Sequence, residues 1–120
     1  MKIESVSLKN AVNSWCKMNS MKSITVAELK NWIDNNEDFQ LIDVREPFEF
    51  DEANMNGILI PMNEVPDQVG QFAKDKKVVV HCRSGKRSAS VIQYLESQHG
   101  YDNLYNLKGG ILAWIDAYGA

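Results

Sequence analysis

A run of β-branched residues that passes through a short polar loop into a helical pattern constrains the fold of this chain most strongly. Val78–Val80 is a continuous apolar run, which is typical of a strand buried on both faces. The run ends at His81 and Cys82, and a helical pattern over about residues 87–99 follows, with Gly100 as its expected stop. Such a strand–loop–helix unit is typical of a parallel sheet covered by helices.

The same alternation of strand and helix patterns extends over residues 23–118. Further strands are expected near Ile24 and over residues 40–45, 58–60 and 103–107. Further helices are expected after residue 25, after Pro47, from about Glu64 to Ala73 behind an Asn63 cap, and over residues 111–118. Several strands are apolar throughout, so the sequence predicts a three-layer α/β/α fold with a parallel sheet in the middle.

The first expected helix has a clear start and an apolar side. Thr25 and Glu28 have the Ser/Thr-x-x-Glu spacing of a capping box, in which each residue satisfies a backbone N–H group of the other. Leu29, Trp32 and Ile33 then recur at helical spacing. We expect all three of these side chains to face the interior.

The 120 residues suffice for one domain with a core, and the patterning divides the chain into two parts. Residues 1–20 show apolar side chains at helical spacing, and a second Met-Lys pair begins at Met21. We therefore expect an N-terminal extension with a helical pattern over residues 1–20 and a domain over residues 21–120. A redox partnership of Cys16 with Cys82 is the less favoured alternative, because nothing in the sequence brings the two together.

Charge and cysteine usage exclude several classes of protein. A net charge of -3 and a pI near 5.3 argue against nucleic acid as the main partner, and no apolar run is long enough to span a membrane. The two cysteines form no disulfide framework and no Cys/His cluster has metal-site spacing, so we expect neither a metal nor another cofactor. The absence of a visible secretory signal and of paired cysteines favours the cytoplasm.

Cys82 opens a loop that carries three cations. The six loop residues are Cys82, Arg83, Ser84, Gly85, Lys86 and Arg87. A cysteine at the N-terminal end of a helix lies in the positive end of the helix dipole, and nearby cations also favour its thiolate form. Backbone N–H groups of such a loop can converge on an anion above the sulfur, and Gly85 permits the turn. The sequence predicts a nucleophilic thiolate with a small anionic ligand; the alternative is an inert buried cysteine with solvated cations.

Three segments are expected to meet at one edge of the sheet, because ligands of open parallel sheets bind beyond the carboxyl ends of the strands. Cys82 follows one strand, Asp43 and Arg45 end a second, and Lys108–Gly110 follows a third. Asp43 and Arg45 can form a structural ion pair or support the loop, and the sequence leaves both interpretations open. His81 is expected to be a packed strand residue rather than a base, because a thiolate needs no base.

Three motifs, in this order and at these separations, resemble those of the rhodanese family. They are Asp43-Val44-Arg45-Glu46-Pro47 with Phe48-Glu49-Phe50, the loop from Cys82 to Ala89, and Leu107-Lys108-Gly109-Gly110 with Trp114. The resemblance covers residues 21–120 and implies a five-stranded parallel sheet between helices. It implies a sulfurtransferase in which Cys82 takes sulfur from a donor such as thiosulfate and becomes a persulfide. An acceptor, which is cyanide or a thiol of a small molecule or protein, then takes that sulfur.

The loop residues have separate roles under this resemblance. Arg83 and Lys86 are expected to bind the anionic oxygens of the donor, because thiosulfate carries two negative charges. Arg87, on the first turn of the helix, is expected to close and orient the loop. Residues 53–61 depart from many family members, which carry a His-x-x-Gly stretch before the third strand, since this stretch has no histidine. The substrate of typical members therefore transfers less directly to this chain.

Two other functions stay open. The loop is also similar to the C-x5-R loop of cysteine phosphatases and arsenate reductases, but the C-x4-R spacing from Cys82 to Arg87 is one residue shorter. The tighter loop suits a single sulfur atom better than a tetrahedral oxyanion, and the geometry of the site must decide. Non-catalytic interaction modules that resemble the family usually lack the cysteine, which is present here.

Overall fold

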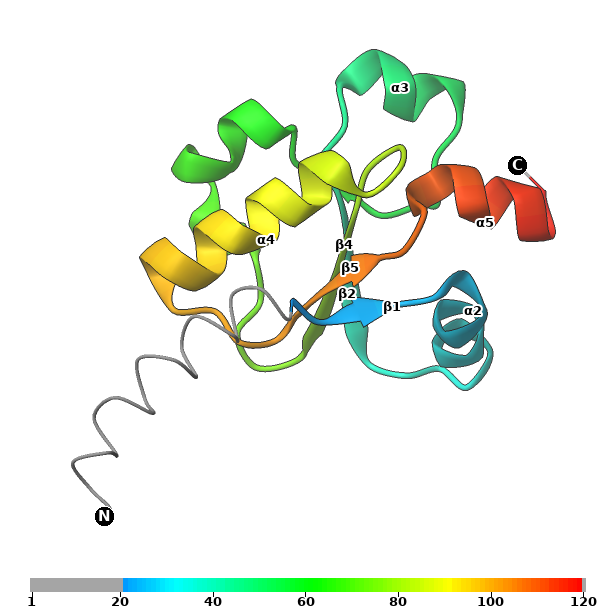
Figure 1. Ribbon diagram of the computed structural model, residues 1–120, viewed down its shortest axis with the longest axis horizontal. Helices are drawn as coiled ribbons and strands as arrows, with labels where there is room; N and C mark the ends of the chain where they lie inside the picture. Colours follow the sequence, from blue (N-terminus) through cyan, green and yellow to red (C-terminus); the bar gives the residue numbers. More distant parts are fainter. Residues whose placement is uncertain (1–20, 120) are drawn as a thin grey trace.

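β4, Lys77–His81, lies in the middle of a parallel sheet in the computed structural model, which describes residues 21–119 (Figure 1). Within these residues the sheet has five strands in the order β1-β5-β4-β2-β3. The other strands are β1 (Ser23–Ile24), β2 (Phe39–Asp43), β3 (Ile58–Leu59) and β5 (Leu104–Leu107). Every pairing is parallel, so the predicted fold class is confirmed.

Helices cover both faces of the sheet (Figure 1). They are α2 (Val26–Asp34), α3 (Pro47–Glu52), α4 (Lys86–His99) and α5 (Gly110–Tyr118). α4 lies on one face, and α2 and α5 lie together on the other, while α3 follows β2 beyond the carboxyl edge of the sheet. The loop after β4, the loop after β2 and the start of α5 therefore lie at one edge, as expected for a site in an open parallel sheet.

The alternation of side chains along β4 decides which layer Cys82 enters. Val78 and Val80 pack in the core under α4, whereas Val79 packs in the core under α2 and α5, and all three are fully buried. Burial of each such side chain contributes roughly 1.5–3 kcal/mol. Cys82 continues the series of Val78 and Val80, so its thiol points toward the first turn of α4, and His81 points to the opposite layer.

The capping box of α2 is confirmed, but one of its three predicted core residues is wrong. The Glu28 N–H donates to Thr25 Oγ1 at 3.1 Å, and the Thr25 N–H donates to Glu28 Oε1 at 2.9 Å. Leu29 is fully buried and Trp32 packs against the same core, but Ile33 is 41% exposed. Ile33 lines an open groove beside α5 instead of the core, because Leu29 and Trp32 already fill the contact with the sheet.

The prediction of an α-helix from Glu64 to Ala73 is also wrong. The segment forms two 3-10 helices, η1 (Met62–Asp67) and η2 (Val69–Gln71). The turns begin at Met62, so Pro66 stands where an α-helix would need its N–H to donate to the Met62 carbonyl. The hydrogen bonds run back three residues instead, as from the Gln68 N–H to the Val65 carbonyl at 2.9 Å. Val65 and Phe72 are nevertheless buried against the α4 side of the core, so the segment still covers that face.

The extension predicted over residues 1–20, and Cys16 within it, lie outside the described residues. Among the helices that the structure describes, none is both long enough and apolar enough to cross a lipid bilayer.

Candidate active site

Cys82 lies at the junction of β4 and α4, with its sulfur directed at the N-terminus of the helix. The side chain is 1% exposed. The Gly85 N–H donates to Cys82 Sγ at 3.1 Å, and the Ser88 N–H lies 3.4 Å from the same atom. The Ser88 hydroxyl oxygen is also 3.4 Å from the sulfur. The sulfur thus lies among hydrogen-bond donors at the positive end of α4.

These donors favour the thiolate form of Cys82. Burial is the largest influence and raises the pKa of the thiol, but hydrogen bonds from the Ser88 side chain and from the N–H groups of Ser88, Gly85 and Ser84 together lower the pKa below its ordinary value. Since the thiolate is the nucleophilic form of cysteine, a thiol held in this way can act as a nucleophile.

The start of α5 holds the carbonyl side of the loop. The Ile111 N–H donates to the Cys82 carbonyl at 2.9 Å, and the Leu112 N–H donates to the Arg83 carbonyl at 3.2 Å. These are N–H groups of the first turn of α5, which have no partner within their own helix. With its carbonyl groups bound to α5, the loop is free to present its N–H groups to the sulfur on the other side.

Gly110 permits this contact between α5 and the loop. Its φ is +60°, in the left-handed region, and a Cβ atom there would lie 2.3 Å from the Arg83 carbonyl oxygen and 2.5 Å from the Cys82 carbonyl oxygen. Only glycine fits such an approach of two backbones. The packing of α5 on the loop therefore explains the glycine at position 110.

The cations of the loop fall into two groups. Arg83 and Lys86 are exposed, and neither makes an ion pair or a side-chain hydrogen bond to any of the described residues. Arg87 instead forms a bidentate ion pair with Glu49 on α3, with Nη1–Oε1 at 2.8 Å and Nη2–Oε2 at 2.9 Å. Arg83 and Lys86 are thus available to an anionic ligand, whereas Arg87 ties the loop to α3. The sequence analysis placed Glu49 in the first motif but gave it no role.

The Arg87–Glu49 pair predicts a specific loss of stability in acid. The hydrogen bonds from Arg87, with one from the Glu46 N–H, lower the pKa of Glu49 from 4.5 to about 2, although burial opposes the shift. Because the folded-state pKa is the lower one, the contribution is complete above pH 4.5 and is lost as the pH falls toward 2. It amounts to at most about 3 kcal/mol at ~1.36 kcal/mol per pKa unit, since Arg87 is partly exposed.

Urea unfolding of the wild type and Glu49→Gln across this pH range measures the effect. The wild type is expected to be more stable near neutral pH, and the difference should shrink through the window from 4.5 to about 2. A difference that stays constant through this window would show that the charge of Glu49 does not stabilise the fold.

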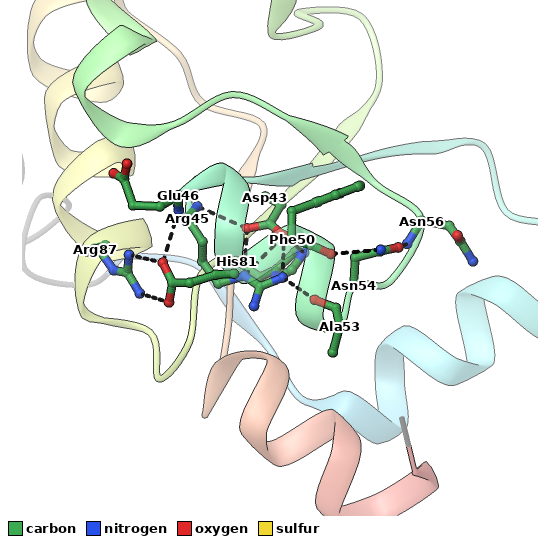
Figure 2. Close-up of polar contacts among 10 residues, drawn as sticks. Asp43, Arg45, Glu46, Phe50, Ala53, Asn54, Asn56, His81 and Arg87 are labelled. Carbon is green, nitrogen blue, oxygen red and sulfur yellow. Dashed lines mark hydrogen bonds and ion pairs between the residues drawn. The ribbon is translucent and has the colours of Figure 1, made fainter.

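Asp43 and Arg45 form a buried ion pair behind the loop (Figure 2). Asp43 Oδ2 accepts from Arg45 Nη2 at 2.7 Å, and Asp43 Oδ1 accepts from the backbone N–H and Nε of Arg45, each at 3.0 Å. Arg45 Nη2 also donates to the Ala53 carbonyl at 2.7 Å. The pair therefore joins the end of β2 to the end of α3, which supports the structural interpretation of these two residues.

His81 is fully buried beside this pair. Its Nε2 lies 3.9 Å from Asp43 Oδ2, and neither ring nitrogen has a hydrogen-bond partner among the described residues. Burial lowers the pKa of His81, and the attraction of Asp43 only partly opposes this, so the ring is neutral near pH 7. A buried, neutral ring in the layer opposite Cys82 fits a packed strand residue.

Ser88 and Asn106 belong to the site although the sequence analysis did not select them. The Ser88 hydroxyl donates to Asn106 Oδ1 at 2.6 Å, and Asn106 Nδ2 donates to the Gly85 carbonyl at 3.1 Å. Gly85 has a φ of +110°, which aims its N–H at Cys82 Sγ and its carbonyl toward β5. The signals were small: Ser88 shares the buried side of α4 with Val91, and Asn106 is polar in a mostly apolar strand.

Asn54 occupies the segment in which many rhodaneses carry a histidine. Its Nδ2 donates to the Phe50 carbonyl at 3.0 Å, and its Oδ1 accepts from the Asn56 N–H at 2.9 Å (Figure 2). Asn54 therefore closes the end of α3 and shapes the turn before β3. Residues 21–119 contain no group of three or more His, Cys, Asp or Glu side chains that could bind a metal ion.

Several known proteins are similar to this chain in both sequence and fold. The chain is 36% identical over 95 residues to a sulfurtransferase of Allochromatium vinosum, covering 78% of this chain and 88% of the relative. It is 33% identical over 101 residues to the thiosulfate sulfurtransferase GlpE of Shewanella oneidensis, covering 83% and 98%. A rhodanese-like domain protein from Staphylococcus aureus has a TM-score of 0.72 and 41% identity, covering 78% of this chain and 91% of that one.

A protein from Rhodopseudomonas palustris, described as a possible tyrosine phosphatase, has a TM-score of 0.76 at 23% identity and covers 85% of each chain, so it shares the fold alone. Residues 25–117 match the family described as Rhodanese-like domain, and these residues contain the thiol, its donors and the loop cations. The chain belongs to the family of rhodanese-like domains.

Proposed function

We propose that this protein is a sulfurtransferase that carries sulfur on Cys82. The observation that supports this most is the sulfur of Cys82, held by N–H groups at the start of α4 beside two exposed cations that have no ion-pair partner within residues 21–119. The Cys82 thiolate attacks the outer sulfur of thiosulfate or a similar donor. The Sγ–S bond forms, the S–S bond of the donor breaks, and sulfite leaves with the electron pair.

The acceptor completes the cycle. Cyanide or a thiolate attacks the outer sulfur of the persulfide, and Cys82 leaves as a thiolate. Arg83 and Lys86 bind the anionic oxygens of the donor, and the N–H groups of the loop, including that of Ser84, stabilise the charged outer sulfur. Asp43 and Arg45 hold the backbone behind the loop without touching substrate.

The proposal extends to the organisation of the chain and its partners. Residues 21–120 form the catalytic domain, and residues 1–20 are an appended segment. The partners are a small anionic sulfur donor and a thiol or protein acceptor, with neither nucleic acid nor a membrane involved. The compartment is the cytoplasm, where an unpaired thiol stays reduced.

The rival reaction on an oxyanion has less support from the site. The loop cation at the C-x4-R position, Arg87, is bound through both terminal nitrogens to Glu49. A tetrahedral oxyanion above Cys82 would therefore find only Arg83 and Lys86 with free side chains among the loop cations. Family relatives named as sulfurtransferases favour the same choice.

Intact mass tests the proposal directly. After incubation with thiosulfate and removal of reductant, the protein is expected to gain one sulfur, roughly 32 Da, as the covalent intermediate of a nucleophilic mechanism. The gain should disappear on addition of cyanide and should be absent in Cys82→Ser. No gain, combined with turnover of an aryl phosphate or arsenate, would assign the site to oxyanion chemistry. Absence of both signals would favour an interaction module.

A further inference from the structure

The hydroxyl group of Ser88 lies between the sulfur of Cys82 and the side-chain amide of Asn106. Ser88 is fully buried, and its Oγ is 3.4 Å from Cys82 Sγ and 2.6 Å from Asn106 Oδ1. The carbonyl oxygen of Gly85 is a third acceptor, at 3.2 Å. A hydroxyl group carries one proton, so it can donate to only one of these acceptors at a time.

The Gly85 carbonyl fixes the orientation of Asn106. A carbonyl oxygen can only accept, so the amide nitrogen of Asn106, 3.1 Å away, faces it, and the amide oxygen faces Ser88. The Ala89 N–H donates to the same carbonyl at 3.1 Å, so both of its lone pairs have partners. The Ser88 proton is left with two acceptors, which are Asn106 Oδ1 and Cys82 Sγ.

We propose that Ser88 is a two-position hydrogen-bond donor that serves Asn106 while the Cys82 sulfur is neutral and serves the sulfur while it is a thiolate. The change requires only rotation of the hydroxyl group. Its place in a catalytic cycle rests on the proposed function, in which the sulfur alternates between thiolate and inner atom of a persulfide. Ser88 is then a catalytic residue, because it touches the reacting atom, and Asn106 is a positioning residue that acts through Ser88.

The second half of the cycle gains most from this arrangement. When the acceptor attacks the outer sulfur, the bond to Cys82 Sγ breaks and its electron pair stays on Sγ. The Ser88 proton turns from Asn106 to Sγ as this charge develops. A hydrogen bond that forms with the developing charge stabilises the transition state more than the persulfide, and so speeds the step.

The other charged and titratable groups near the thiol do not change in the variants that test this. They are Arg83 and Lys86 in the loop, Arg87 with its partner Glu49, and His81 at the end of β4. A shift in the ionisation of Cys82 in a Ser88 or Asn106 variant therefore reports the hydrogen bonds of these two side chains.

Alkylation by iodoacetamide across pH, followed on the Cys82 peptide of the full chain by mass spectrometry, tests the proposal. This readout separates Cys82 from Cys16. In Ser88→Ala the midpoint is expected to rise by about one pKa unit, which corresponds to a tenfold weaker stabilisation of the thiolate and is typical of a lost hydrogen bond to a charged group. Ser88→Thr keeps a hydroxyl group and should retain most of the wild-type behaviour. Ser90→Ala, an exposed serine of the same helix, should leave the midpoint unchanged.

Asn106→Ala distinguishes a two-position donor from a merely structural contact. Asn106→Ala removes the acceptor that lies 2.6 Å from the Ser88 oxygen and leaves the Gly85 carbonyl, at 3.2 Å, as the remaining competitor of the sulfur. A charged thiolate is a stronger acceptor than a neutral carbonyl, so the midpoint should fall, opposite to Ser88→Ala. A midpoint that stays constant or rises in Asn106→Ala, or one that is unchanged in Ser88→Ala, would overturn the proposal.

The alkylation experiment needs no sulfur donor, so its result is separate from that of the thiosulfate experiment. Opposite midpoint shifts without a persulfide would keep the two-position donor and refute sulfur transfer. Formation of a persulfide without those midpoint shifts would support sulfur transfer and refute the two-position donor. With both present, discharge of the persulfide by cyanide should be about tenfold slower in Ser88→Ala than in Ser90→Ala.

Discussion

Gly110→Ala is expected to lower the free energy of unfolding by about 3 kcal/mol or more and to reduce sulfur transfer more than tenfold, from the costs of backbone strain and overpacking combined. The new Cβ would lie 2.3 Å and 2.5 Å from the carbonyl oxygens of Arg83 and Cys82. These are backbone atoms, which cannot rotate away as a side chain can. The loop must therefore move from α5, and its N–H groups must move from the sulfur.

Two other glycines provide matched controls for urea unfolding. Gly100 also has a positive φ, +69°, but its Cβ would meet nothing within 4 Å, so Gly100→Ala measures backbone strain without the clash. Gly70 has neither a positive φ nor a near neighbour, so Gly70→Ala should change stability little. If Gly110→Ala were no more damaging than Gly100→Ala, the close contact of α5 with the loop would not be important.

Asp43→Ala is expected to cost about 3–5 kcal/mol, the usual effect of removing one partner from a buried ion pair. Arg45 is 4% exposed and would keep only the Ala53 carbonyl as an acceptor in place of a carboxylate. The guanidinium charge cannot be released by deprotonation, because arginine stays charged at any ordinary pH. The measurement is the midpoint of urea unfolding, with circular dichroism as the signal.

A double variant separates the charge from the loss of packing. Asp43→Ala combined with Arg45→Met removes the unpaired charge, so it should be more stable than Asp43→Ala alone. Asp34→Ala breaks the exposed pair with Lys30, which solvent screens, and should cost much less stability than Asp43→Ala. Equal losses in Asp43→Ala and the double variant would mean that the buried charge is not the cause.

Local patterns predicted the frame of the site correctly. Val78–Val80, the loop that follows and α4 depend on neighbours within a few residues, so periodicity and loop composition were sufficient to place them. Cys82 at the start of a helix follows from the same local information. The placement of Arg83 and Lys86 in solvent also agrees with their position in a polar loop.

The partners of the loop could not be predicted in the same way. Glu49 is 38 residues from Arg87, and Asn106 is 18 residues from Ser88, so each pair depends on how β2, β4 and β5 lie in the sheet. No periodicity relates such positions. The resemblance to rhodaneses indicated which loop matters, but the hydrogen bonds around its sulfur required the three-dimensional arrangement.

The errors in the sequence analysis have local causes of two kinds. Helical spacing placed Ile33 on the apolar side of α2. Leu29 and Trp32 already make the contact of that side with the sheet, so Ile33 lies in a groove beside α5. In the segment from Glu64 to Ala73 the expected Asn63 cap suggested an α-helix, but the turns begin earlier, at Met62, and Pro66 then lacks the N–H that an α-helix would need. Burial of Val65 and Phe72 was compatible with either helix type.

The shortness of the outer strands has a consequence for behaviour at high concentration. β1 and β3, which border the sheet, have only two residues each, whereas the valine-rich β4 is enclosed between two neighbours. An exposed strand edge is a template on which other chains can add by backbone hydrogen bonding, and a very short edge offers few such bonds. The β-branched residues of β4, Val78–Val80, are thus enclosed between two other strands, so the folded molecule should resist edge-to-edge aggregation during storage and crowding.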